Sequence, residues 1–146
     1  MQNVFIIKTM NLLIDHYMLP NKPLTNHEIL QAIDPLNIQS FKGVFSRNEL
    51  SSPPNDNECG ILNLDDSHGT GTHWVAWFKQ GVECIYFDSF GIKPPLELQF
   101  YLNHDIQYNT RQIQRETDVI CGHLCLYVLK RLSDGNKYLT ILFSLY

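Results

Sequence analysis

The sequence has little charge: Asp, Glu, Lys and Arg together make up 18% of its residues. Its 11 Lys and Arg residues are spread thinly against 15 Asp and Glu, and the formal net charge of -4 gives no indication of a nucleic-acid surface. Low-complexity tracts, internal repeats and blocks of like charge are also missing. These absences, together with 44% hydrophobic residues, exclude a disordered tail or a fibrous repeat and predict a packed globular domain.

Long hydrophobic runs are lacking too. The most apolar segment, residues 1–20, is interrupted by Lys8, Asp15 and His16, and it is too short for a membrane span. It also lacks the basic start and the small-residue cleavage site of a signal peptide. We therefore interpret residues 1–24 as a helix or an N-terminal extension and residues 25–146 as a single domain, with no membrane contact.

Cysteine is scarce, with only four positions: Cys59, Cys84, Cys121 and Cys125. Because no secretory signal is recognisable, we expect an intracellular protein with reduced thiols, which argues against a disulfide framework. Reduced intracellular cysteines are structural, metal-bound or catalytic. The stretch DVICGHLC raises all three possibilities, since His123 lies between two of the cysteines.

Hydrophobic patterns and turn residues predict one α+β domain. Thr25 with Glu28 three positions later has the spacing of a capping box, which marks a helix start. The runs CGILNL, HWVAWFK and CIYFDS are rich in β-branched and aromatic residues, and QGVE between the last two predicts a hairpin. The expected elements are a helix at about 26–33, a loop at 48–58, strands at 59–64, 73–79 and 84–89, a helix at 94–103, a strand at 105–114, a helix from 121, and a strand or short helix at 138–146.

Four polar residues occupy positions that packing alone would not require. His73 heads a predicted strand, Asp88 ends the next one, Gln114 ends another, and Cys121 opens a helix. A thiol with a pKa of about 8.5 is mostly protonated at neutral pH, so a nucleophilic cysteine needs an imidazole and gains from helix N-terminal amides. Cys121 is placed to receive such amides, and His73 could supply the imidazole.

These residue types predict the catalytic roles that are found in a thiol protease. His73 would deprotonate the thiol and later protonate the leaving amine, while Asp88 would orient the imidazole ring. The side-chain amide of Gln114 and the backbone N–H of Cys121 would stabilise the oxyanion. Taken singly, His73 could instead be a satisfied core histidine and Asp88 a strand-ending cap.

The pair of cysteines around His123 could also suggest zinc or a redox site. Side chains at positions i and i+2 of a helix diverge, and the spacing of Cys121 and Cys125 is not the usual Cys-x-x-Cys. We therefore expect no metal and no cofactor. Cys125 is interpreted as a small core residue, and His123 as a partly exposed helix residue outside the apolar stripe.

The blocks GTHWVAW, YFDSFG and IQRETDVICGHLC resemble those of the adenain family, which includes the adenovirus protease and related proteases of Maverick-type DNA transposons. The order His, Asp, Gln, Cys also resembles the ubiquitin-like-protein proteases of the same clan. In adenain the glutamine precedes the nucleophile by seven positions, which selects Gln114 here (121 − 114 = 7). In the ubiquitin-like-protein proteases the spacing is one shorter, a position that Arg115 occupies here. The resemblance covers roughly residues 25–132.

This resemblance implies a papain-like α+β cysteine protease fold of the adenain type, with a central mixed or antiparallel sheet packed against the helix that carries Cys121. It implies a cysteine endopeptidase acting on protein or peptide substrates, with viral or transposon capsid and core precursor proteins as the expected ones. The expected location is the cytosol or nucleus of a host cell, or the virion. An activating peptide is a further candidate partner, although the cysteine that tethers it in adenain has no counterpart between residues 89 and 120. DNA assists adenain, but the acidic balance here argues against such a role.

Two other functions remain open at this stage. An isopeptidase that removes ubiquitin or a similar modifier would use the same chemistry on a different substrate. A non-catalytic remnant, domesticated or structural, is suggested by the 25 residues that follow Cys121 (146 − 121), since adenain has further C-terminal helices. The presence of all four candidate catalytic residues argues against a remnant.

Overall fold

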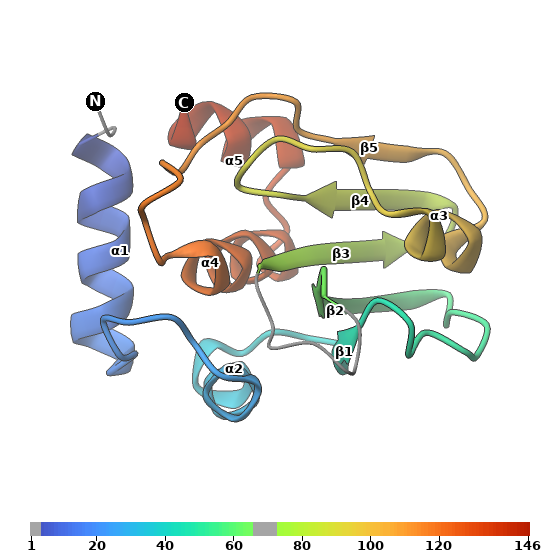
Figure 1. Cartoon of the computed structure of the whole chain (residues 1–146), viewed down its shortest axis with the longest axis horizontal. Coiled ribbons are helices and arrows are strands. Elements are labelled where there is room, and N and C mark those ends of the chain that lie inside the picture. The colour runs from blue at the N-terminus through green and yellow to red at the C-terminus, as the bar shows by residue number, and fades with distance from the viewer. Residues whose placement is uncertain (1–3, 66–72) are drawn as a thin grey trace.

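The described part of the chain, residues 4–65 and 73–146 of a computed structural model, is an α+β fold built on one five-stranded mixed sheet (Figure 1). Helices pack on both faces of this sheet. The elements are α1 (Val4–Tyr17), α2 (Asn26–Leu36), β1 (Phe41–Ser46), β2 (Asn57–Asn63), β3 (Trp74–Gln80), β4 (Glu83–Phe87), α3 (Leu96–Leu102), β5 (Ile106–Tyr108), α4 (Cys121–Ser133) and α5 (Tyr138–Leu145).

The strand order is β1-β2-β3-β4-β5, with antiparallel pairing in the centre and parallel pairing at both edges. The predicted hairpin is confirmed: β3 and β4 pair antiparallel, with Gln80 opposite Glu83. Its turn passes through Gly81, whose φ of +60° lies in the left-handed region that glycine adopts at little cost. An antiparallel hairpin places the start of β3 beside the end of β4, and both ends carry candidate catalytic residues.

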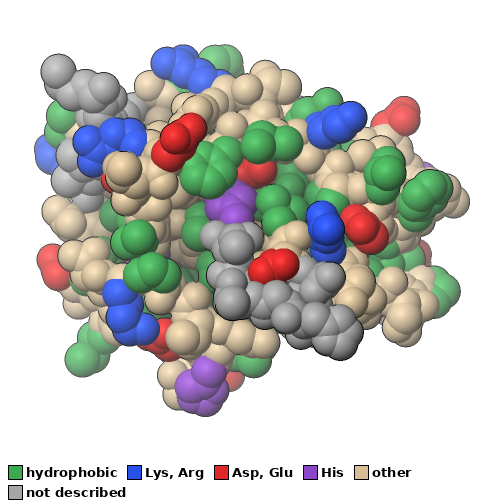
Figure 2. Space-filling model, in the orientation of Figure 1, with side chains coloured by type: hydrophobic (Ala, Val, Ile, Leu, Met, Phe, Trp, Pro, Cys, Tyr) green, Lys and Arg blue, Asp and Glu red, His purple; other side chains and the backbone are tan. Residues whose placement is uncertain are grey.

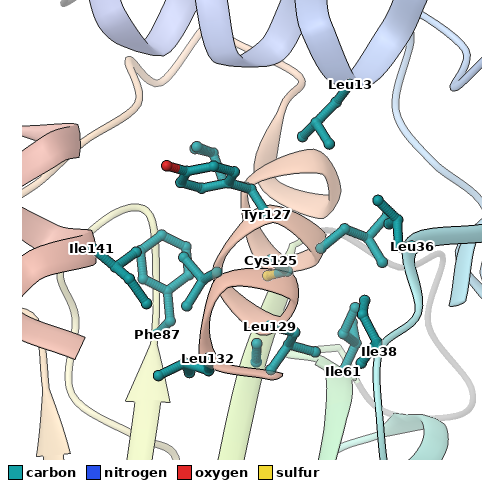
Figure 3. Close-up of a cluster of buried hydrophobic side chains, with 14 of the residues drawn as sticks. Leu13, Leu36, Ile38, Ile61, Phe87, Cys125, Tyr127, Leu129, Leu132 and Ile141 are labelled. Atoms are coloured by element: carbon teal, nitrogen blue, oxygen red, sulfur yellow. The ribbon is translucent and has the colours of Figure 1, made fainter. Parts of the chain in front are cut away.

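The main core surrounds α4, which lies against β3 and is covered on its other sides by α1, α2 and α5 (Figure 1). Figure 3 shows side chains from α1, α2, β2, β4 and α5 converging on the helix. Because neighbours cover α4 on every side, its buried positions extend well beyond one stripe and run continuously from Gly122 to Leu129. The labelled members are Leu13, Leu36, Ile38, Ile61, Phe87, Cys125, Tyr127, Leu129, Leu132 and Ile141.

A second, smaller core fills the opposite face of the sheet under α3, with Trp77 at its centre. The indole N–H of Trp77 donates to the buried carboxylate of Glu58 at 2.9 Å, and the hydroxyl of Tyr101 donates to the same oxygen at 2.8 Å. Lys42 lies 3.5 Å from the other oxygen of Glu58. These partners compensate the free-energy cost of burying the Glu58 carboxylate.

Most predicted elements are present, with shifted ends. The helix predicted at 26–33 has the capping box of Thr25 and Glu28 and continues to Leu36. The strand predicted at 105–114 is wrong beyond Tyr108. There the side chain of Asn109 bonds the backbone N–H and oxygen of Asp88, and the pairing with β4 ends. The final segment, left open between strand and helix, is the helix α5.

The N-terminal segment lies against the rest of the fold. Ile6, Met10 and Leu13 on α1 are buried in the main core, as are Leu19 and Leu24 in the segment that follows. Across residues 4–65 and 73–146, no helix combines the length and the hydrophobicity that crossing a membrane requires.

Candidate active site

His73 and Asp88 meet at the end of the β3–β4 hairpin. His73 directly precedes β3 and Asp88 directly follows β4, so the antiparallel register brings them together. The Nε2 of His73 donates to Oδ1 of Asp88 at 2.6 Å, and both side chains are buried. The same oxygen accepts the backbone N–H of Phe90 at 2.8 Å. Asp88 is thus both the strand-ending cap that the sequence allowed and the partner of the imidazole.

Cys121 is the first residue of α4 and is partly exposed, whereas Cys59, Cys84 and Cys125 are buried. Its thiol lies close enough to the side chain of His73 for each group to shift the pKa of the other. The backbone N–H groups of Trp74 and Gly122 also act on the sulfur and favour its thiolate form. The first turn of a helix leaves such amides without intrahelical partners, and the helix dipole favours negative charge there.

These contacts shift the two pKa values in opposite directions. Burial on its own lowers the pKa of His73, but the hydrogen bonds to Asp88 and Cys121, with their charges, outweigh burial and raise the pKa of His73 to about 9. Burial on its own raises the pKa of Cys121, but the hydrogen bond and charge of His73 and the two backbone N–H groups lower it below its ordinary value. Both shifts favour the form in which the proton rests on the imidazole and the sulfur is a thiolate.

Gln114 lies in the loop between β5 and α4 rather than at the end of a strand, and its side chain is buried. Its Oε1 accepts the hydroxyl of Ser89 at 2.6 Å, and its Nε2 donates to the backbone oxygen of Asp118 at 3.0 Å. The neighbouring Arg115 is exposed and is ion-paired with Asp118 at 3.1 Å. Gln114 is therefore bound to the residue next to Asp88, while no hydrogen bond between its side chain and that of Cys121 is seen among the described residues.

Three residues that support this site were not singled out from the sequence. The ring of Phe90 stacks on His73 with centroids 4.5 Å apart and an interplanar angle of 24°. Asn109 binds both backbone groups of Asp88, at 3.0 Å and 2.6 Å, and Ser89 binds Gln114. Ser89 and Phe90 lie in the block YFDSFG, so their adjacency to Asp88 was an available signal, but nothing local identifies Asn109.

The prediction that His123 is partly exposed is wrong. Its side chain is fully buried, and its Nε2 lies 2.8 Å from the backbone oxygen of Pro20. The segment between α1 and α2 covers this position, a contact across 103 residues that helical spacing alone cannot reveal. Cys125 is buried in the main core, as expected.

The described residues also show where possible metal ligands lie. Within residues 4–65 and 73–146, His, Cys, Asp and Glu side chains do not gather in the groups of three or more that could hold a metal ion. His123 is directed to Pro20 and Cys125 into the core, so neither joins Cys121 as a ligand. His68, to which no role was assigned, lies outside the described residues.

Comparison with known proteins supports the fold. No family model matches the chain, and no curated protein matches its sequence. Among solved structures, the crystal structure of the ASFV pS273R protease is similar to it, with a TM-score of 0.58 and 20% sequence identity. The match covers 85% of this chain and 63% of the other, so this chain spans less than two thirds of the protease's length. The chain has the α+β fold of a papain-like protease, as predicted.

Proposed function

We propose that the protein is a cysteine endopeptidase with Cys121 as nucleophile, His73 as base and acid, and Asp88 as the group that orients His73. The observation that carries this proposal is the position of His73, which is hydrogen-bonded to the carboxylate of Asp88 and lies close enough to the thiol of Cys121 for each to shift the pKa of the other. Asp88 accepts from one ring nitrogen, which leaves the other for sulfur. The likeness to a viral protease fold supports the same chemistry at the coarse level.

The reaction begins with the thiolate of Cys121 attacking the carbonyl carbon of a peptide bond, which forms a C–S bond and an oxyanion. The C–N bond then breaks, and the imidazolium of His73 gives its proton to the leaving amine. A water molecule, deprotonated by the now neutral His73, attacks the thioester; the C–S bond breaks and releases the thiolate and the carboxylic acid, which then loses its proton to solvent. The imidazole thus donates one proton and recovers one in each cycle.

The oxyanion requires donors that are already aimed at it. We assign this role to the backbone N–H of Cys121, in the first turn of α4, and to the side-chain amide of Gln114. Arg115, at the spacing of the ubiquitin-like-protein proteases, is exposed and paired with Asp118, while Gln114 is buried. This contrast favours the adenain-like spacing.

The substrates that fit this proposal best are precursor proteins of a viral or transposon particle. A hollow of about 260 Å³ beside the segment leading to Cys121 could receive a substrate side chain, since Met10, Ile14, Val119 and Ile120 contribute to its lining. On the face drawn in Figure 2, Lys and Arg side chains lie apart from one another among acidic ones, which suits a polypeptide better than DNA. An activating peptide remains part of the proposal.

The test is cleavage of a proteome-derived peptide library, read by mass spectrometry of the new termini. We expect wild-type protein to produce cleavages that are absent for Cys121→Ala and retained for Cys125→Ala, the matched control one helical turn away in the core. Fast labelling by ubiquitin-like modifiers carrying a thiol-reactive C-terminus, without library cleavage, would indicate an isopeptidase instead. If neither library cleavage nor modifier labelling is seen when DNA or candidate activating peptides are added, the catalytic proposal has no support.

A further inference from the structure

The side-chain amide of Gln114 is held from two sides. Ser89 donates its hydroxyl to Oε1 at 2.6 Å, and the backbone oxygen of Asp118 accepts from Nε2 at 3.0 Å. An amide nitrogen carries two N–H groups, so one of them remains for another acceptor. That second N–H has no partner among the described residues. It is the group that the proposed function assigns to the oxyanion.

The two contacts have different effects on the amide. A carbonyl oxygen only accepts, so Asp118 determines that the nitrogen end of the Gln114 amide faces it. A serine hydroxyl can donate or accept, so Ser89 adapts to whichever end it meets and here donates to Oε1. Ser89 therefore fixes the position of the amide once Asp118 has fixed its orientation. Without Ser89, a buried oxygen would have no donor and the amide would be free to rotate toward one.

Ser89 is itself rigidly placed. It is fully buried and follows Asp88, whose backbone N–H and oxygen are both bound by the side chain of Asn109. The backbone oxygen of Ser89 accepts from the N–H groups of Ile113, at 2.8 Å, and Gln114, at 3.2 Å. Main chain and side chain of Ser89 thus both hold the segment that carries Gln114.

We propose that Ser89 is a positioning residue that aligns the free N–H of Gln114 for the oxyanion. The end of β4 would then position two catalytic functions through consecutive side chains: Asp88 orients His73, and Ser89 orients Gln114. This inference rests on the proposed peptidase function, because the aligned N–H has an acceptor only when an oxyanion develops on the substrate.

A double-mutant cycle of Ser89→Ala and Gln114→Ala tests the coupling. We expect Ser89→Ala to lower kcat about tenfold with little change in KM, and Gln114→Ala to lower it by about 10²–10³, as loss of an oxyanion donor does. The double variant should be no slower than Gln114→Ala alone, because Ser89 acts only through Gln114. Ser89→Cys, which retains a weak donor, should fall between wild type and Ser89→Ala.

Two results would overturn the inference. If Ser89→Ala slows the Gln114→Ala protein by the same factor as wild type, Ser89 acts independently of Gln114. If Ser89→Ala moves the pH midpoint of Cys121 alkylation, it acts through Asp88 and His73 instead. Thermal unfolding of each variant verifies that the folded state persists.

A measurement that needs no turnover separates this inference from the proposed function. In nitrogen-15 NMR spectra, the two side-chain amide protons of Gln114 should give exchange-protected signals away from the positions of a solvent-exposed glutamine in wild type, and faster-exchanging signals nearer those positions in Ser89→Ala. Unchanged signals would refute positioning by Ser89 even in an active enzyme. A wild-type protein that cleaves nothing would refute the proposed function, while the spectra would still decide whether Ser89 orders the amide.

Discussion

Replacing His73 by Ala should return Cys121 to the behaviour of an ordinary or less acidic thiol. The substitution removes the hydrogen bond and the positive charge of His73, which both lower the pKa of Cys121. Burial, which raises that pKa, and the N–H groups of Trp74 and Gly122, which lower it, remain. A thiol with the reference pKa of about 8.5 is ionised to only about 0.3% at pH 6.

The size of the effect on reactivity follows from two opposed factors. Because the pKa of Cys121 is lowered, we expect it to have a larger thiolate fraction at pH 6 than the same thiol without His73, but a thiolate of lower pKa is intrinsically less nucleophilic. We expect the second factor to offset part of the first, so the alkylation rate at pH 6 should fall about tenfold in His73→Ala. The pH midpoint of the reaction should move upward as well.

The assay is iodoacetamide alkylation from pH 4 to pH 10, followed by intact-mass spectrometry. Cys59, Cys84 and Cys125 are buried, so native protein should take up one label, at Cys121. Gln114→Ala is the matched control, since its side chain does not contribute to the pKa of Cys121. A wild-type thiol that reacts at pH 6 no faster than free cysteine, or a midpoint that His73→Ala leaves unchanged, would refute the thiolate–imidazolium pair.

Two further predictions concern the active pH range and the second core. Because the pKa of His73 is raised to about 9, kcat/KM for peptide cleavage should fall above about pH 9, where the imidazolium loses the proton that the leaving amine needs; a profile still rising at pH 10 would contradict this. Gly60→Ala would place a Cβ 2.3 Å from the indole ring of Trp77. Such overpacking costs about 1–3 kcal/mol, or a decrease of roughly 2–12 °C in Tm by calorimetry, and an unchanged Tm would show that the ring can move aside.

Strands β2, β3 and β4 were predictable because each is a short apolar run bounded by turn residues, and the hairpin because its connection is short. Strand β1 was not predicted, since Lys42 and Gly43 interrupt its apolar residues. The end of β5 at Tyr108 was not predictable. It follows from Asn109 binding the backbone of Asp88, 21 residues earlier in the chain. A contact between residues so far apart in sequence cannot be read from the local alternation of apolar and polar residues. The same holds for Glu58, whose burial makes sense only with Trp77 and Tyr101 around it.

The candidate site followed from residue type, order and spacing, and these properties are visible in a sequence. His73 and Asp88 could be paired because a hairpin brings its two open ends together. The support of Gln114 by Ser89 could not be foreseen, because it depends on how the loop after β5 returns to the end of β4. Sequence thus indicated the candidates for the reacting groups, and the fold was needed to indicate the group that we propose aligns one of them.

His73 and His123 illustrate why adjacency in sequence is a poor guide to chemistry. His123 is two residues from Cys121, but its Nε2 lies against the neutral carbonyl of Pro20, and burial lowers the pKa of His123. His73 is 48 residues from Cys121 (121 − 73), yet it contacts the thiol and a buried carboxylate, and its pKa is raised. Both side chains are buried, so burial alone cannot explain the opposite directions. What differs is a direct hydrogen bond to a buried carboxylate, since Asp88 bonds His73 whereas Glu28 acts on His123 only through its charge. That bond favours a protonated His73 beside the thiol of Cys121.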